Sequence, residues 1–199
     1  PDIQAGFRRI EDNKSPGGYR WVPLHDRKAM DAVLQIAEAY SHQIDTVVHL
    51  GDHLDLAPWS TRWTSDSSLK YTSNAALREL YAGFLVPLRE ILPHAHMVYM
   101  EGNHEKRIED ALAAKLGEAS TLRTADTLEG YTLLSIPSLL ALDSIDIEYI
   151  APYGRVWWLY DKIRISHGSV ARRGGGNTAA EYLKRATSSM IWGHTHRLE

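Results

Sequence analysis

Short apolar runs that end at polar turns constrain the fold of this chain more than any other feature. Each run is rich in Val, Ile, Met or aromatic residues, and each is followed at once by a turn with Gly or Asn, which is typical of a β-strand that ends in a loop. The runs are Thr46–Leu50, Met97–Met100, Ile163–Ser166 and Met190–Trp192.

Longer amphipathic segments lie between these runs. The segments Asp26–Tyr40 and Ser73–Leu92 place apolar residues three and four positions apart, a spacing that predicts helices with one buried face. Pro87 should bend the second helix because it lacks a backbone N–H. Strands that alternate with helices predict an α/β fold with a parallel or mixed sheet, and ligand sites in such folds form at the carboxyl ends of the strands.

Two long connections interrupt this order. Gly6–Tyr19 is polar and contains Ser15-Pro16-Gly17-Gly18, so we interpret it as an excursion after a first strand that forms a loop over the site. Asp55–Tyr71 is a second long connection, and such connections are usually functional.

Length and composition limit the class of protein. A chain of 199 residues with 44% hydrophobic and 24% charged residues predicts one globular domain, residues 1–199. The net charge of -3 provides no general positive field for nucleic acid. No apolar run suits a signal peptide or membrane span, and the lack of Cys fits a reducing compartment, so we expect a cytoplasmic protein without membrane contact. Since the chain starts at Pro1 and stops within a polar loop, we expect it to be trimmed at both ends.

Nitrogen and oxygen donors follow the predicted strands. Carboxylates, amides and several of the ten His residues at one edge of a sheet favour first-row divalent metals over Ca, which prefers oxygen ligands alone. Each motif taken alone is equally typical of a turn or a helix cap. The donors are Asp2, Gln4, Asp52, Asp55, Asn103, His104, His167, His194 and His196.

Taken together in this order, the motifs resemble the calcineurin-like metallophosphoesterase superfamily, and their spacing resembles its phage and prophage members. The motifs are Gly51-Asp52-His53-Leu54-Asp55, Gly102-Asn103-His104-Glu105, His167-Gly168 and Gly193-His194-Thr195-His196. The resemblance implies two mixed β-sheets packed as a sandwich and flanked by helices. It also implies metal-dependent hydrolysis of phosphoesters with two divalent metal ions, for which we expect Mn, with Fe, Zn, Ni or Mg as alternatives.

The resemblance also implies a ligand set. Asp52 would bridge the two metals, and the ligands of one metal would be Asn103, His167 and His194. Asp2 and His196 would bind the other. The family's first motif is normally Asp-x-His, and here Gln4 stands two positions after Asp2. The rival first motif, His25-Asp26, is interpreted as a helix start with Asp26 as the N-cap.

The same resemblance implies the catalytic roles. A hydroxide that bridges the metals would attack phosphorus in line, His104 would protonate the leaving oxygen, and the Asp55 carboxylate would hold the imidazole in its tautomer. Arg107 could bind substrate, although an ion pair with Glu109 or Asp110 explains it nearly as well.

Arg172 and Arg173 are further candidates for phosphate binding, next to a helix that Asn177 or Thr178 would cap and that would run to Arg185. A solvated loop is about equally compatible with this stretch.

The substrate class is open at this level. We favour a phosphodiesterase or nuclease-like activity, and a phosphomonoesterase activity stays open. The expected substrate is a phosphoester that could be a nucleotide or nucleic acid. Leu56-Ala57 stand where protein phosphatases carry Arg-Gly, which disfavours that activity. The alternative function is a catalytically weak or inactive module that uses the fold for binding. The oligomeric state is not predicted.

Overall fold

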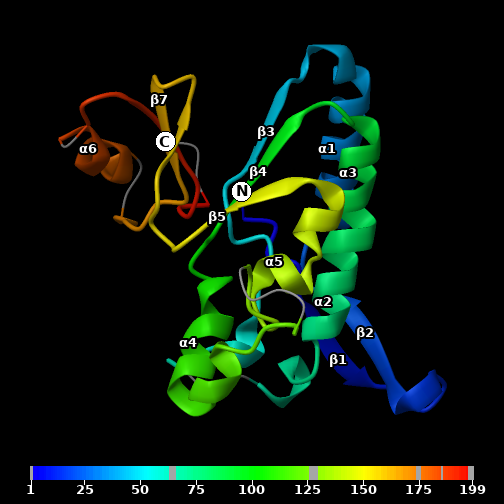
Figure 1. The fold of residues 1–199 in the computed structure, drawn as a ribbon. Coiled ribbons are helices and arrows are strands. Elements are labelled where there is room, and N and C mark those ends of the chain that lie inside the picture. Colours follow the sequence, from blue (N-terminus) through cyan, green and yellow to red (C-terminus); the bar gives the residue numbers. More distant parts are fainter. Residues whose placement is uncertain (1, 63–65, 126–129, 174–175, 185, 197–199) are drawn as a thin grey trace.

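The computed structural model describes residues 2–62, 66–125, 130–173, 176–184 and 186–196. Two three-stranded sheets pack face to face, with helices on the outer side of each (Figure 1). This is the α/β sandwich expected from the sequence. No helix within these ranges is both long enough and apolar enough to cross a membrane.

The first sheet is parallel throughout. Its order is β3–β4–β5, formed by Thr46–His49, His96–Met100 and Ile147–Ile150. In β4, Met97 and Tyr99 pack into the core against the helices, whereas Val98 and Met100 pack against the second sheet. Because both faces of β4 are buried, its sequence is a continuous apolar run rather than an alternating one.

The second sheet is mixed. It contains β6 (Trp157–Leu159), β7 (Ile163–Ser166) and β8 (Ser189–Trp192). β6 pairs antiparallel to β7, and β8 pairs parallel to it. A small apolar cluster of Leu50, Val98, Met100 and Ile165 joins the two sheets. The four strands expected from the sequence are therefore present, and β5 and β6 are additional.

Helices cover the outer face of the parallel sheet. α1 (Arg27–Ala39) begins at Asp26, whose side chain accepts hydrogen bonds from the backbone N–H groups of Lys28 and Ala29, as the capping prediction requires. The second predicted helix is divided into α2 (Ser73–Leu80), a π-helical turn (Tyr81–Leu85) and α3 (Val86–Ile91). The irregular turn lies just before Pro87, where the ring removes one helical hydrogen bond.

Three further helices complete the outer layers. α4 (Lys106–Lys115) follows β4, and the short α5 (Ile136–Leu139) precedes β5. α6 (Asn177–Leu183) lies beside the mixed sheet, where the rings of Tyr182 and Trp192 are 4.7 Å apart.

The prediction of a loop at Gly6–Tyr19 is wrong. β1 (Phe7–Glu11) and β2 (Tyr19–Pro23) form an antiparallel hairpin, which lies away from the ends of β3–β5 (Figure 1). The turn forms because Gly17 and Gly18 both adopt positive φ angles, 80° and 76°. Asp55–Tyr71 is a connection as expected, with short 3-10 turns at Ala57–Trp59 and Ser67–Leu69; residues 63–65 within it lie outside the described ranges.

Candidate metal centre

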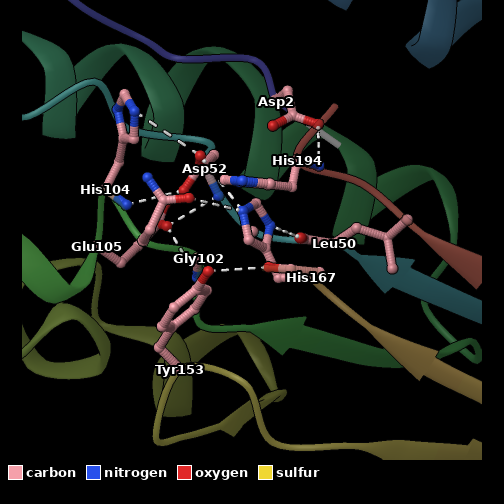
Figure 2. A network of polar contacts seen from close by, with 12 residues as sticks. Asp2, Leu50, Asp52, Gly102, His104, Glu105, Tyr153, His167 and His194 are labelled. Carbon is pink, nitrogen blue, oxygen red and sulfur yellow. Dashed lines mark hydrogen bonds and ion pairs between the residues drawn. The ribbon is translucent and has the colours of Figure 1, made fainter. Parts of the chain in front are cut away.

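Loops from both sheets meet at one place. Asp52 lies in the loop after β3 and Asn103 in the loop after β4, while His167 and His194 follow β7 and β8. Figure 2 shows Asp52, His167 and His194 directed toward one another from these separate loops. The chain folds this way because parallel strands deliver their carboxyl ends to the same edge of the structure.

Glu105 connects two of these loops. Its fully buried carboxylate accepts hydrogen bonds from the backbone N–H groups of Asp52 (2.8 Å), His53 (2.9 Å) and Leu54 (3.2 Å). It also accepts from the N–H of Gly102 and the hydroxyl of Tyr99, at 3.1 Å and 2.8 Å. Burial, followed by the charge of Asp52, raises the pKa of Glu105, and these donors oppose that rise. The sequence offers no signal for this role, because the donors at Asp52, His53 and Leu54 lie 51 to 53 residues away.

Two glycines permit the close approach of the loops. A Cβ at Gly102 would lie 2.2 Å from Oδ1 and 2.3 Å from the backbone nitrogen of Asp52. Gly51 has a φ of +82°, and a Cβ there would lie 2.7 Å from the nitrogen of Gly102. Larger residues at either position would push Asp52 away from the other loops.

Three side chains form the central cluster. Donor atoms of Asp52, His167 and His194 all lie within 4.8 Å of one another. Burial opposes charge on Asp52, but its hydrogen bond to His167 and the charges of His167 and His104 outweigh burial and hold the pKa of Asp52 below its usual range. Burial, with the nearby charge of His167, lowers the pKa of His194. A charged carboxylate beside a neutral imidazole is the state in which both groups bind metals.

The tautomer of His167 tests whether a cation fits. Its Nδ1 lies 2.5 Å from the carbonyl oxygen of Leu50, which can only accept, so Nδ1 carries the proton. Its Nε2 lies 3.1 Å from Oδ1 of Asn103 and 3.4 Å from Oδ2 of Asp52. Burial lowers the pKa of His167, but the hydrogen bond to Asp52 and the charge of Asp52 outweigh burial and raise it. Nε2 therefore binds a proton that it donates to Asp52, and a divalent cation at this position would take the place of that proton. The residues therefore fit a metal ion.

A second group lies beside the first. Oδ1 of Asp2 is 3.4 Å from Nε2 of His196, and Nε2 of Gln4 is 3.3 Å from the same atom. Oδ2 of Asp2 accepts from the backbone N–H of His194 at 3.1 Å, which links this group to the central cluster. Within the described ranges, Oδ1 of Asp2 and Nδ1 of His194 are buried without hydrogen-bond partners, so both have unused capacity to bind a cation.

The backbone at these residues is unusual. The five residues Asp2, Gln4, Asp52, His194 and His196 have φ angles between 49° and 69°, a left-handed conformation that costs a side-chain-bearing residue about 1–3 kcal/mol. Strain of this kind persists only where surrounding contacts enforce it. Six other non-glycine residues of the described ranges share this conformation: Leu56, Tyr71, Ala141, Asp146, Tyr160 and Asp161.

His104 lies at the edge of the cluster. Its backbone N–H donates to Oδ1 of Asp52 at 2.8 Å, and its Nε2 is 3.8 Å from Oδ2 of the same carboxylate. Its Nδ1 is 2.9 Å from the backbone carbonyl of Asp55 and 3.5 Å from the Asp55 carboxylate. The two residues are thus adjacent as expected, but the carbonyl is the closer partner of the imidazole and determines its tautomer.

Arg107 is directed toward His104. Its guanidinium donates to the carbonyl of Asp55 at 2.6 Å and to Nε2 of His104 at 2.9 Å. The alternative of an ion pair with Asp110 is wrong, because Lys106 forms that pair. The side chain of Arg107 is 17% exposed, so part of it is accessible to solvent.

The structure does not bring Arg172 and Arg173 to the cluster. Both are exposed, and their backbone is bound to the start of α6 through Thr178 Oγ1 and the Asn177 side-chain amide. The predicted cap of α6 is wrong: Gly176 occupies the N-cap position with a φ of 74°, and no side chain caps the helix. The predicted helix end, Arg185, lies outside the described residues.

Comparison with known proteins agrees with this geometry. The sequence profile of the family described as calcineurin-like phosphoesterase matches residues 24–198. Two curated relatives, both named "Gene 54 protein", come from Mycobacterium phage D29 and Mycobacterium phage L5 and are 30% and 29% identical over 188 residues. Each alignment covers 88% of this chain and 66% of the relative. No solved structure matches.

The profile match begins after Asp2 and Gln4, so it does not include these two candidate ligands. It does include Asp52, Asn103, His104, His167, His194 and His196 in the order in which the loops present them. Because the match covers most of the chain, this protein belongs to the calcineurin-like phosphoesterase family, whose members are metal-dependent hydrolases.

Proposed function

We propose that this chain hydrolyses phosphodiesters, with nucleotide or nucleic acid substrates favoured, and that it uses two divalent metal ions, preferably Mn. Asn103, His167 and His194 would hold one ion, Asp2, Gln4 and His196 the other, and Asp52 would bridge them. When bound, such ions lower the pKa of a water molecule and neutralise charge that develops on the phosphoryl oxygens.

One observation carries this proposal. Nε2 of His167 lies 3.1–3.4 Å from oxygens of Asn103 and Asp52, and because the Leu50 carbonyl occupies Nδ1, Nε2 is the nitrogen that would bind a metal. A metal would displace the proton on Nε2, and Asp52, His167 and His194 place ligand atoms within 4.8 Å of one another around that position. The arrangement therefore favours a functional metal centre.

His104 would hold the proton for the leaving oxygen. Its Nδ1–H is held by the Asp55 carbonyl, which aims Nε2 at the space beside Asp52. Nε2 now accepts from Arg107, so Arg107 has to leave this nitrogen before His104 can present a proton there. A substrate phosphoryl oxygen would draw the guanidinium away, since charge-assisted bonds to phosphate are stronger than a bond to a neutral imidazole.

Gln4 would act as a metal ligand only after its side-chain amide rotates. Its nitrogen, which can only donate, faces His196, so ligation requires the amide to turn and present its oxygen. The neutral oxygen is a weaker ligand for Zn than the imidazole that the family pattern has at this position, and it favours Mn or Mg.

The decisive experiment combines metal analysis with turnover. The purified chain is stripped with EDTA, titrated with Mn by calorimetry, and assayed with bis(p-nitrophenyl) phosphate and p-nitrophenyl phosphate. We expect two binding events and faster hydrolysis of the diester. Asp52→Asn should abolish turnover and weaken both events, whereas Asp31→Asn, an exposed position on α1, should change neither. Normal turnover by Asp52→Asn would refute the mechanism.

A further inference from the structure

A basin of about 370 Å³ opens beside the central cluster of Asp52, His167 and His194. Asn103 and His194 form the side that belongs to the cluster, and Arg62, Lys106 and Arg107 line the rest together with Asp110. Its volume is within the range of pockets for small molecules, so it can hold more of a substrate than one phosphoryl group.

The charge of this basin is positive. Asp110 is the single carboxylate among its lining residues, and it is paired with Lys106. The guanidinium of Arg107 is held by the Asp55 carbonyl and by His104. Arg107 also lies 3.7 Å from the Asp55 carboxylate, so within the described part of the chain Arg62 is the guanidinium of this basin that has no carboxylate partner.

Arg62 differs from Arg107 in having no assigned contact. Its backbone N–H donates to Ser60 Oγ, but within the described part of the chain its guanidinium forms neither a hydrogen bond nor an ion pair. Its charge nevertheless acts on Arg107: burial is the main cause that lowers the pKa of Arg107, the charges of Asp55, Asp52 and Glu105 raise it, and the charge of Arg62 lowers it further. Two like charges in one basin are unfavourable until an anion lies between them.

We propose that Arg62 binds a second phosphate group of the substrate, next to the one that is cleaved. This inference rests on the proposed function and deepens it, since it assigns a substrate that carries at least two neighbouring phosphates. A planar guanidinium suits this task because it binds two phosphate oxygens at once. The second phosphate belongs either to the next linkage of an oligonucleotide or to the polyphosphate of a nucleotide.

Matched substrates test the assignment. The thymidine dinucleotide TpT and trinucleotide TpTpT differ by one phosphodiester, and the p-nitrophenyl esters of thymidine 5'-monophosphate and 5'-triphosphate differ by a polyphosphate. With Mn, Arg62→Ala should lower kcat/KM on the order of tenfold for the longer member of one pair and leave both shorter members within about twofold. The pair that responds identifies the source of the second phosphate. Arg62→Lys should retain part of the effect, and Arg78→Ala, at an exposed position on α2, should have none.

Equilibrium binding separates this inference from the proposed function. Affinities for the same compounds are measured by calorimetry in EDTA, where no turnover occurs. The parent chain should bind the longer member of the responding pair more tightly, and Arg62→Ala should erase the difference. Equal affinities in the parent, or equal losses for long and short substrates in Arg62→Ala, would overturn the role of Arg62. If the parent chain binds the longer member more tightly but hydrolyses none of the substrates, the proposed function alone is overturned.

Discussion

The carboxylate of Glu105 accepts a hydrogen bond from the backbone N–H of Asp52 at 2.8 Å. Through this bond the loop after β4 holds the loop after β3, and the central metal-ligand candidate is positioned by a residue that does not itself face the cluster. Three more backbone N–H groups and the Tyr99 hydroxyl share the same carboxylate. Support of this kind orients the side chains that bind a metal ion.

Glu105→Gln should destabilise the protein even without metal. The new amide NH₂ would face backbone donors in a buried site, and unsatisfied buried donors cost about 1–3 kcal/mol each. We expect a loss of about 3 kcal/mol in the free energy of unfolding, measured with urea in EDTA. Glu109→Gln is the matched control, because Glu109 is exposed on α4. Equal unfolding midpoints for the two variants would show that the network does not support the fold.

Gly102→Ala should displace Asp52. The added methyl group would lie 2.2 Å from Asp52 Oδ1, a distance at which the loops have to separate. We expect weaker Mn binding by calorimetry and a lower melting temperature. Gly117→Ala serves as the control, since a Cβ there meets no atom within 4 Å. Parental metal affinity in Gly102→Ala would contradict the close packing of these loops.

His104→Ala should retain metal and lose turnover. A general acid contributes on the order of 10²–10⁴-fold, and less when the leaving alcohol is already acidic. The loss should therefore be larger for a dinucleotide than for bis(p-nitrophenyl) phosphate. His94→Ala, at an exposed position, should behave like the parent. Equal losses on both substrates would assign His104 an electrostatic or structural role instead.

Gln4→His should tighten the weaker metal site. An imidazole nitrogen is a better ligand for Zn than a neutral amide oxygen, so the second binding event should gain affinity and shift its preference from Mn toward Zn. The first event, assigned to Asn103, His167 and His194, should change little. Gln43→His, outside the site, is the control. Two unchanged affinities in Gln4→His would show that Gln4 is not a ligand.

Acid should weaken the fold through His49. Its Nδ1 lies 3.1 Å from Nε2 of the buried His53, and burial lowers the pKa of His49 from 6.5 to about 3. Below pH 6.5 His49 is therefore protonated in the unfolded chain but stays neutral in the folded chain until the pH approaches 3. Stability is constant above that pH and falls as pH drops from 6.5 toward 3, by about 1.4 kcal/mol per unit for this group.

Urea unfolding at pH 7 and pH 5 measures this effect. His49→Gln should reduce the difference between the two pH values by about 2 kcal/mol, because the amide does not titrate and can still donate to His53. His94→Gln, at an exposed position, should keep the parental difference. An unchanged pH dependence in His49→Gln would mean that His49 is not the group responsible.

Local sequence determined the framework of this protein. The strands β3, β4, β7 and β8 were predictable because each is an apolar run that stops at a polar turn. The capping of α1 by Asp26 was predictable because it depends on neighbouring residues alone. The gathering of donors at one edge also follows from sequence, because parallel strands present their carboxyl ends together.

Only the tertiary structure decided the contacts between distant segments. The hairpin of β1 and β2 depends on a partner strand that the local polarity of Gly6–Tyr19 does not indicate. Glu105 gains its role from N–H groups in another loop, and Arg107 turns to His104 rather than to Asp110 because the Asp55 carbonyl lies within reach. Arg62 lines the basin together with residues that are distant in the sequence, such as Arg107 and His194, so its position depends on the tertiary structure. A sequence pattern reports periodicity and neighbours, whereas these roles arise from distances across the folded chain.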